Sequence, residues 1–296
     1  MWEEIEMTRP TPDDATLLAG LIGKGISQSR TPAMHMAEAK AQGMTGLYVK
    51  LDMDDPKRAD LTLEQMVLAA EAAGFDGLNI TYPYKIDIIP LLDELAETAK
   101  FVGAVNTVVF KDGKRVGHNT DLTGFAENYR RGLSDAPKEH VLLVGAGGAG
   151  VAVAHALGQC NVTRLTIMDV DPARAQALAD QVAGNCPDMV VGAVSSVDQL
   201  DGENRPDGLV NATPMGMAKL PGMCVPAAFL GPDMWVADIV YFPLETELLR
   251  TARALGCRVL PGSGMTVFQA VRAFELFTGR SADPERMKAR FDAFDT

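Results

Sequence analysis

The segment between Val141 and Asp169 constrains the fold more than any other part of this chain. A short apolar run at residues 141–144 leads into a glycine-rich turn, which continues as an alanine-rich helical stretch to residue 157. A second apolar run, residues 165–168, ends at an acidic residue. This order of strand, turn, helix and strand is the setting in which a G-x-G-x-x-G pattern binds a dinucleotide. The pattern is formed by Gly145, Gly147, Gly148, Ala149 and Gly150.

Each glycine of this turn has a physical task in that setting. Gly145 can make the tight turn, Gly147 lets a pyrophosphate approach the backbone, and Gly150 lets helix and strand pack closely. The N-terminus of the helix that follows supplies free N–H groups that can bind the phosphates. The alternative interpretation is an ordinary glycine-rich turn before a helix.

The acidic residue after the second strand bears on the choice of cofactor. Asp169 lies about twenty residues beyond the last glycine, where a carboxylate can accept both ribose hydroxyls of NAD. The same charge repels the 2′-phosphate of NADP. Arg174, one helical turn further, can reach such a phosphate or can simply be a solvated cation. Asp171 precedes Pro172 and is predicted to cap the next helix. We therefore predict NAD, with NADP the weaker candidate.

Composition excludes several classes of function. The chain has 296 residues, and its 27 Lys and Arg against 39 Asp and Glu give a net charge of -12. This charge argues against a nucleic-acid or membrane partner. The length and the 47% hydrophobic content predict two soluble domains. The four cysteines lack metal-binding spacing, which predicts reduced thiols in a cytoplasmic protein without a metal site. Residues 1–10 lack a signal-peptide pattern, and no apolar run is of membrane-spanning length.

Two series of apolar runs alternate with helical patterns along the chain. The first predicts strands at residues 18–22, 47–51, 77–80 and 104–110, and the second at 141–144, 165–168, 189–194, 208–210 and 235–240. One helix of the first series carries Leu63, Met66, Val67 and Ala70 on one face, with Thr62 and Gln65 spaced for a capping box. Such alternation predicts an α/β fold with mainly parallel sheets covered on both faces.

The joint between the two series is predicted near residues 119–121, where a helix begins and carries the chain across. The last long helix has Val267, Val271 and Phe274 along one stripe and is expected to return to the first domain. The predicted substrate-binding domain therefore comprises residues 1–120 plus 264–296. Residues 121–263 form the predicted dinucleotide-binding (Rossmann) domain.

Several polar residues stand where an alcohol could be oxidised. Oxidation by NAD needs a group that accepts the hydroxyl proton, and a lysine in a dry cleft can do so because desolvation lowers its pKa. Lys85 belongs to a polar segment, residues 79–85, directly after a predicted strand, and Asn106 is placed after another. Asp121 heads the crossing helix. Taken alone, Lys85 also fits a surface lysine and Asp121 a helix cap.

Histidine offers a second candidate for the base. His118 stands beside Asn119, and its ordinary pKa suits proton transfer at neutral pH. His35, His140 and His155 lie in helical or pre-strand contexts and are interpreted as packing or surface residues.

Further motifs carry a resemblance to a known family. They are GAVNT at 103–107, NTDLTG at 119–124, NATPMG at 211–216 and YFPLETELL at 241–249. With the glycine pattern they make the chain resemble the shikimate/quinate dehydrogenases over nearly its full length, and the NAD-dependent quinate/shikimate enzymes most closely. NADP-using members usually place Asn-Arg-Thr where this chain has Asp169-Val170-Asp171, which again favours NAD.

The resemblance implies roles for individual residues. Lys85 and Asp121 would form the catalytic pair. The implied substrate contacts are Ser29, Thr31, Asn79, Thr81, Asn106, Tyr241 and Gln269. The implied cofactor neighbours, besides the glycine pattern and Asp169, are Val170, Arg174, Thr213, Gly262 and Met265.

The segment expected to bind the substrate carboxylate departs from the usual family pattern. The family commonly has Ser-x-Ser-Pro, and this chain has Ser29-Arg30-Thr31-Pro32. Thr31 before a proline also fits a helix N-cap, and hydroxyls at a helix N-terminus can bind a carboxylate without a buried arginine. The threonine variant resembles family members that accept quinate. Gly25 and Gln28 replace a frequent proline and a frequent histidine.

The resemblance therefore implies an enzyme in which Lys85 accepts the C3 hydroxyl proton of quinate or shikimate while hydride passes to NAD. One alternative is a shikimate-specific NAD or NADP dehydrogenase. Another is a dinucleotide-sensing protein without turnover, which would need neither Lys85 nor Asp121. The implied partner is a small hydroxylated ring acid, and nothing in the sequence indicates an oligomeric state.

Overall fold

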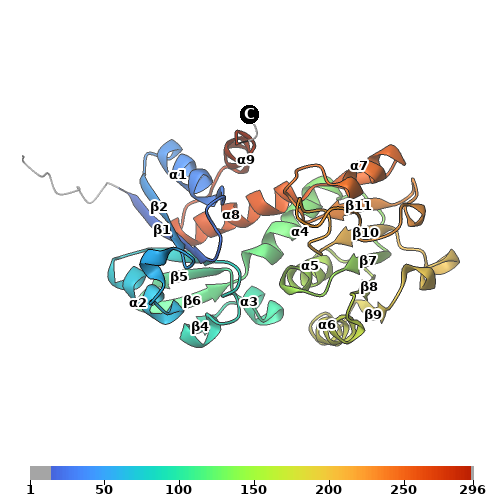
Figure 1. The fold of residues 1–296 in the computed structure, drawn as a ribbon, viewed down its shortest axis with the longest axis horizontal. Helices are drawn as coiled ribbons and strands as arrows, with labels where there is room; N and C mark the ends of the chain where they lie inside the picture. Colours follow the sequence, from blue (N-terminus) through green and yellow to red (C-terminus); the bar gives the residue numbers. More distant parts are fainter. Residues whose placement is uncertain (1–14, 295–296) are drawn as a thin grey trace, which may run out of the picture.

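The computed structural model describes residues 15–294, which form two halves, each built on a six-stranded sheet (Figure 1). The prediction about a signal peptide concerns residues 1–10, which lie outside the described residues. No helix within 15–294 combines the length and the apolar character needed to cross a membrane.

The second half contains a fully parallel sheet in the order β12-β11-β10-β7-β8-β9. Its strands are β7 His140–Val144, β8 Arg164–Met168, β9 Val190–Val194, β10 Gly208–Asn211, β11 Trp235–Asp238 and β12 Arg258–Leu260. The main helices of this half are α5 Gly148–Gln159, α6 Pro172–Asn185 and α7 Glu247–Ala254. All five predicted strands are confirmed, and β12 was missed because it has only three residues.

The first half contains a mixed sheet in the order β2-β1-β3-β5-β6-β4. Its strands are β1 Thr16–Gly23, β2 Thr45–Asp52, β3 Gly77–Ile80, β4 Glu94–Leu95, β5 Thr107–Lys111 and β6 Lys114–His118, and its helices are α1 Thr31–Ala41, α2 Leu63–Ala72 and α3 Glu97–Val102. The sheet is mainly parallel as predicted, but β5 runs antiparallel to β3 and β6. The capping box at the start of α2 is confirmed.

Strands β4 and β6 were not predicted. β6 is polar and follows β5 through a two-residue turn at Asp112 and Gly113, both of which have positive φ. An Asp-Gly pair between two strands is a strong hairpin signal. The sequence therefore contained the information for β6, in its turn residues rather than in hydrophobic periodicity. Single-turn helices at Pro56–Arg58, Ile89–Leu91, Val197–Gln199, Gly202–Asn204 and Ala227–Phe229 complete the connections.

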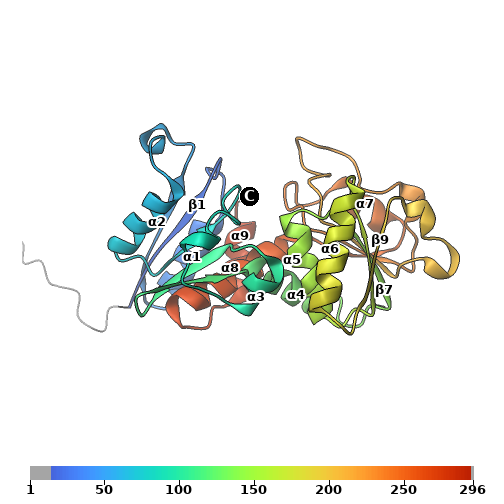
Figure 2. The same cartoon turned by 90° about the horizontal axis from the view of Figure 1, so that it is seen from below.

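Two long helices join the halves. α4 Thr120–Gly132 begins at the predicted joint, capped by the Asn119 side chain, and packs along α8 Gly262–Thr278. Figures 1 and 2 place both helices between the two sheets. α8 buries Phe274 against the first sheet, which confirms the predicted return, and α9 Pro284–Asp292 then packs on α1. The proposed domain boundaries, at residues 121 and 264, lie in the first turns of these two bridging helices.

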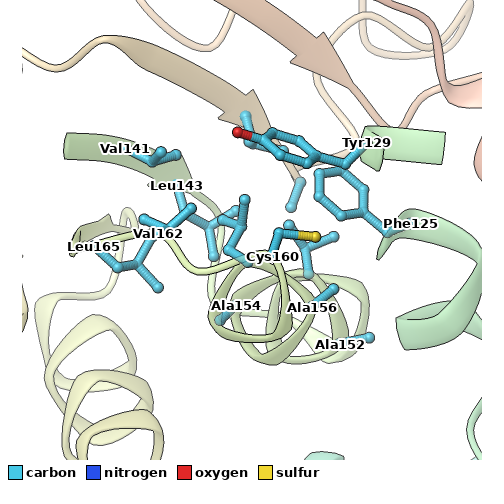
Figure 3. Close-up of a cluster of buried hydrophobic side chains, with 14 of the residues drawn as sticks. Phe125, Tyr129, Val141, Leu143, Ala152, Ala154, Ala156, Cys160, Val162 and Leu165 are labelled. Carbon is cyan, nitrogen blue, oxygen red and sulfur yellow. The ribbon is translucent and has the colours of Figure 1, made fainter. Parts of the chain in front are cut away.

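The largest apolar core lies between α4, α5 and the second sheet (Figure 3). Phe125 and Tyr129 of α4 face Val141 and Leu143 of β7, with the alanines of α5 beside them. Because alanine side chains are short, α5 can lie close to the strands that precede and follow the glycine turn. The N-terminus of α5 is thereby held rigidly at the carboxyl end of the sheet, facing the first half.

Candidate active site

The polar residues singled out in the first half converge at one edge of its sheet. Asn79 stands near the end of β3, and Asn106 immediately precedes β5. The sequence-based placement of Asn106 after a strand is therefore wrong. Because β5 is antiparallel to β3, its start lies beside the end of β3, and the main-chain N–H of Ile80 donates to the Asn106 carbonyl at 2.8 Å.

The structure brings Lys85 and Asp121 together. Lys85 Nζ donates to Asp121 Oδ2 at 2.6 Å. Asp121 occupies the first turn of α4, and the main-chain carbonyl of Lys85 accepts from the N–H of Val105 at 2.8 Å, which fixes the loop that carries the lysine. The two side chains are 31% and 15% exposed, so the pair faces a cavity that is open to solvent.

This cavity has a volume of about 780 Å³ and lies between the two halves. The first half and the bridging helices contribute Ser29, Thr31, Asn79, Thr81, Lys85, Asn106, Asp121 and Gln269, and the second half contributes Tyr241. Five predicted cofactor neighbours line the same cavity, namely Gly147, Gly148, Ala149, Thr213 and Met265. The Lys85–Asp121 pair and the glycine turn therefore face one continuous space.

The remaining predicted cofactor residues do not line the cavity. Gly145 has φ +105°, and a Cβ on Gly150 would lie 2.0 Å from the Gly145 carbonyl oxygen. A Cβ on Gly262 would lie 2.5 Å from the carbonyl oxygen of Ile239. These three glycines therefore permit the tight turn and the close backbone packing that shape the site.

Asp169 is joined to the glycine turn by hydrogen bonds. Its Oδ2 accepts from the N–H of Ala146 at 2.7 Å, and its Oδ1 accepts from the N–H of Asp171 at 2.9 Å. The neighbouring Val170 side chain is fully exposed. Asp171 caps α6 as predicted, and Arg174 Nε lies 3.5 Å from its carboxylate. A negative charge is thus held beside the turn that the pyrophosphate would approach.

The start of α5 has the properties of a phosphate site. Gly147 is the cap residue and supplies no side chain to the first N–H groups of the helix. Chain neighbours and the backbone of the same helix apart, no atom of the described residues lies within 4 Å of a Cβ built on Gly147 or Gly148, so both face open space. Free N–H donors at a helix N-terminus, beside a surface without side chains, fit the pyrophosphate of a dinucleotide. Within residues 15–294 no cluster of His, Cys, Asp or Glu could hold a metal ion.

The loop before α1 differs in detail from its prediction. α1 begins at Thr31, so its cap residue is Arg30 and Thr31 is not the N-cap. The Ser29 hydroxyl, one residue before the cap, accepts from the N–H of Thr31 at 3.4 Å. Gly25 has φ +64°, a conformation that a proline cannot adopt, which explains the departure at that position.

Sequence reasoning overlooked Arg30, which is only 6% exposed and lines the cavity. Its guanidinium carbon lies 4.4 Å from the centre of the Phe242 ring and 4.8 Å from that of Phe291, and Nη1 donates to the Phe291 carbonyl at 3.0 Å. The carboxylate segment therefore does contain a buried arginine. Its only sequence signal was its place inside the Ser-x-Thr-Pro motif.

The charges around the cavity favour an anionic ligand. The lining contains three cationic side chains, Lys24, Arg30 and Lys85, and one carboxylate, Asp121. The chain as a whole has a net charge of -12. Cationic side chains at the cavity wall of such an acidic protein favour the approach of acids to this cleft. Desolvation raises the pKa of the Tyr241 phenol at the cavity wall, and the Asp121 charge adds to this rise, so the hydroxyl remains a donor.

The histidines do not provide an alternative base in this cavity. His118 lies on β6 and is not among the lining residues, and burial, with a smaller effect of Arg272, lowers its pKa. His35, His140 and His155 are buried, as expected for packing residues.

Three family models match successive parts of the chain. The shikimate dehydrogenase substrate binding domain matches residues 21–108, shikimate / quinate 5-dehydrogenase matches 127–196, and the shikimate 5'-dehydrogenase C-terminal domain matches 262–290. A quinate/shikimate dehydrogenase (NAD(+)) of Corynebacterium efficiens is 50% identical over 93% of this chain and 98% of the relative. This chain belongs to the shikimate/quinate dehydrogenase family.

Two further relatives place the chain within that family. A shikimate dehydrogenase (NADP(+)) of Streptomyces avermitilis is 52% identical over 92% of this chain and 94% of its own length. The solved structure of quinate dehydrogenase from Corynebacterium glutamicum in complex with NAD superposes with a TM-score of 0.90 at 46% identity, covering 94% of this chain and 99% of that one. The predicted family and the two-domain α/β fold are confirmed.

Proposed function

We propose that this enzyme oxidises quinate, shikimate or both at the C3 hydroxyl with NAD, giving the 3-dehydro acid in a reversible reaction. The observation that carries the proposal is the 2.6 Å contact between Lys85 and Asp121 in a cavity that also contains the glycine turn. The similarity to quinate/shikimate dehydrogenases supports the same substrate class.

In this mechanism Lys85, as its neutral amine, accepts the proton of the substrate hydroxyl at Nζ and becomes an ammonium. Asp121 accepts a hydrogen bond from the same nitrogen and so orients it towards the cavity. NAD, when bound, supplies the hydride acceptor. Ser29 and Thr31, beside the Arg30 charge, would hold the carboxylate.

The ring hydroxyls would meet a wall of polar side chains. Each of these is in the cavity lining, and they come from separate segments, so together they can fix the orientation of a ring. The proposed contacts are Asn79, Thr81, Asn106, Tyr241 and Gln269.

The proposed cofactor is NAD. Overall similarity does not decide this choice, because the relatives include an NAD(+) enzyme at 50% identity and an NADP(+) enzyme at 52%. The carboxylate of Asp169, held against the N–H of Ala146, supports NAD because it would repel a 2′-phosphate. Val170 and Arg174, next along the chain, are proposed to lie beside the adenosine part of the cofactor.

The proposal is tested by mixing the protein with NAD or NADP and with quinate or shikimate, and following the absorbance of reduced nicotinamide. We expect the fastest reduction with NAD. Turnover of shikimate alone would support the shikimate-specific alternative. No reduction in any of the four mixtures would overturn the proposal and would favour a dinucleotide sensor.

The cellular setting is part of the same proposal. Burial raises the pKa values of all four cysteine thiols, which are free, so these groups stay protonated and unreactive, as suits a reducing cytoplasm. The only partners that the proposal requires are the cofactor and a small acid.

A further inference from the structure

Two backbone groups fix the orientation of the asparagine amides at the substrate wall. The main-chain N–H of Thr120 can only donate, so the Asn106 atom that it meets at 2.7 Å is the oxygen Oδ1. The main-chain carbonyl of Asn106 can only accept, so the Asn79 atom at 3.3 Å is Nδ2. Nδ2 of Asn106 has no hydrogen-bond partner within residues 15–294, so this side chain brings a donor to the cavity.

A directed chain of hydrogen bonds follows from these orientations. Tyr48 Oη donates to Asn79 Oδ1 at 2.7 Å, and Asn79 Nδ2 donates to Thr107 Oγ1 at 2.9 Å. Thr107 Oγ1 in turn donates to Asn106 Oδ1 at 3.1 Å. Each bond in such a chain polarises the next, so the chain strengthens the donor that Asn106 presents at its end.

Tyr48 reaches the site from two strands away. Strands β2 and β3 lie on either side of β1, and the small residue Ala19 of β1 is the register partner of Tyr48. The tyrosine is 4% exposed, and burial raises its pKa well above the usual value, so the hydroxyl keeps its proton. The His35 ring lies 4.9 Å from the tyrosine ring, but neither of its nitrogens is hydrogen-bonded within the described residues and so neither competes for the hydroxyl.

We propose that Tyr48 and Thr107 are positioning residues, which act through Asn79 and Asn106 and set the pattern of donors and acceptors offered to the ring hydroxyls. This inference rests on the proposed function, because it assigns the asparagines to a hydroxylated substrate. Without the Tyr48 hydroxyl, the buried oxygen of Asn79 loses its protein donor, and the amide is held only by the bonds from Nδ2 to the Asn106 carbonyl and the Thr107 hydroxyl. The bond to Thr107 is then no longer polarised by the tyrosine, and the weakening passes along the chain to Asn106.

The test compares Tyr48→Phe with the unchanged protein in the same assay. Removing the hydroxyl that donates to a buried amide oxygen should lower kcat/KM for quinate or shikimate about tenfold or more. The KM for NAD should stay within about twofold, because the chain of hydrogen bonds ends at the substrate wall. A variant that was merely less well folded would not lower kcat/KM for the acid while leaving the KM for NAD unchanged.

The chain offers a matched control in Tyr129. This tyrosine is 3% exposed, and its hydroxyl has no partner within the described residues. Tyr129→Phe should therefore leave both kcat/KM for the acid and KM for NAD unchanged.

A second pair of variants tests the next step of the hydrogen-bond chain. Thr107→Val removes the hydroxyl at nearly constant shape, and Thr107→Ser restores it. We expect a loss with valine, a recovery with serine, and a loss in the Tyr48→Phe/Thr107→Val double variant smaller than the product of the two single losses.

The outcomes separate this inference from the proposed function. An unchanged protein that turns over neither acid would overturn the proposed function and the inference with it. An active protein whose Tyr48→Phe variant keeps its kcat/KM, or loses NAD binding to the same extent as substrate binding, would overturn the inference alone.

Discussion

The two halves of the molecule contribute different kinds of group to one cavity. The second half offers mainly backbone, at the N-terminus of α5, where Gly147 and Gly148 face open space. The first half offers side chains that come from separate segments, such as Lys85 after β3 and Asn106 before β5. A site made of consecutive backbone groups is encoded locally, whereas a site made of scattered side chains exists only after folding.

The separation along the chain makes this difference concrete. Lys85 and Asp121 are 36 residues apart in sequence and 2.6 Å apart in space. The residues of the glycine turn, by contrast, are neighbours in both. We therefore expect substitutions in the first half to affect chemistry most, and substitutions near the glycine turn to affect cofactor preference.

The largest expected effect follows from Lys85→Ala. Loss of the proton acceptor should lower kcat about 10²–10⁴-fold, while NAD still binds with its usual KM.

Asp121→Asn should lower kcat more than it raises the KM for the acid, since it disturbs the orientation of the lysine. Steady-state kinetics measure both. Lys100→Ala, at an exposed lysine of α3, is the control. Near-normal turnover of Lys85→Ala would contradict the conclusion that side chains of the first half carry the chemistry.

A smaller effect is expected from Asp169→Asn in the second half. The amide can still accept from the N–H of Ala146, but the negative charge is gone. The ratio of kcat/KM for NAD to that for NADP should fall about tenfold, because repulsion of the 2′-phosphate is relieved. Asp171→Asn makes the same change of charge two residues further on and should alter the ratio less. An unchanged ratio in Asp169→Asn would remove the electrostatic basis for NAD preference.

The smallest effect concerns stability and its dependence on pH. Glu38 of α1 is fully buried, and it accepts hydrogen bonds from Arg286 of α9 at 2.6 and 2.8 Å. Burial by itself would raise the pKa of Glu38, but the bonds from Arg286, Gln42 and the N–H of Asp283, with the Arg286 charge, lower it overall. The stabilisation is therefore complete above the ordinary carboxyl pKa and is lost as pH falls through the lowered value.

Glu38→Gln removes this titration while keeping the shape of the side chain. We expect a Tm about 5 °C below that of the unchanged protein at neutral pH, and a difference that shrinks towards acid pH. Thermal melts across a pH series measure this. Glu245→Gln, at an exposed glutamate of the second half that pairs with Arg253, should change Tm little at any pH. A constant difference at all pH values would argue against the ion pair as its source.

The fold could be predicted where local patterns agreed with the final structure. Apolar strands such as β7 and β10 are buried in full and stand out as apolar runs. β6 was missed because it is polar and only partly buried, although the Asp112-Gly113 pair indicated a hairpin turn before it. The antiparallel direction of β5 was also missed, since periodicity reports burial and not strand direction.

The site was predicted less evenly. Lys85 was found because a polar segment follows a predicted strand, and Asp121 because it heads the crossing helix; the family resemblance then implied their roles. Arg30 was overlooked because its burial depends on Phe242 and Phe291, which are far away in sequence. Tyr48 carried no signal at all, because its importance comes only from a hydrogen bond across an intervening strand.

The sequence by itself determined the glycine turn, its helix and the acid that follows, because all of these depend on residues close together along the chain. It also determined the family, through motifs spread over the whole length. The family resemblance implied the pairing of Lys85 with Asp121, but only the tertiary structure decided its geometry and the approach of Tyr48 to Asn79, since both depend on the packing of separate elements. The physical reason is that a side-chain contact between distant residues has no counterpart in local periodicity or turn chemistry.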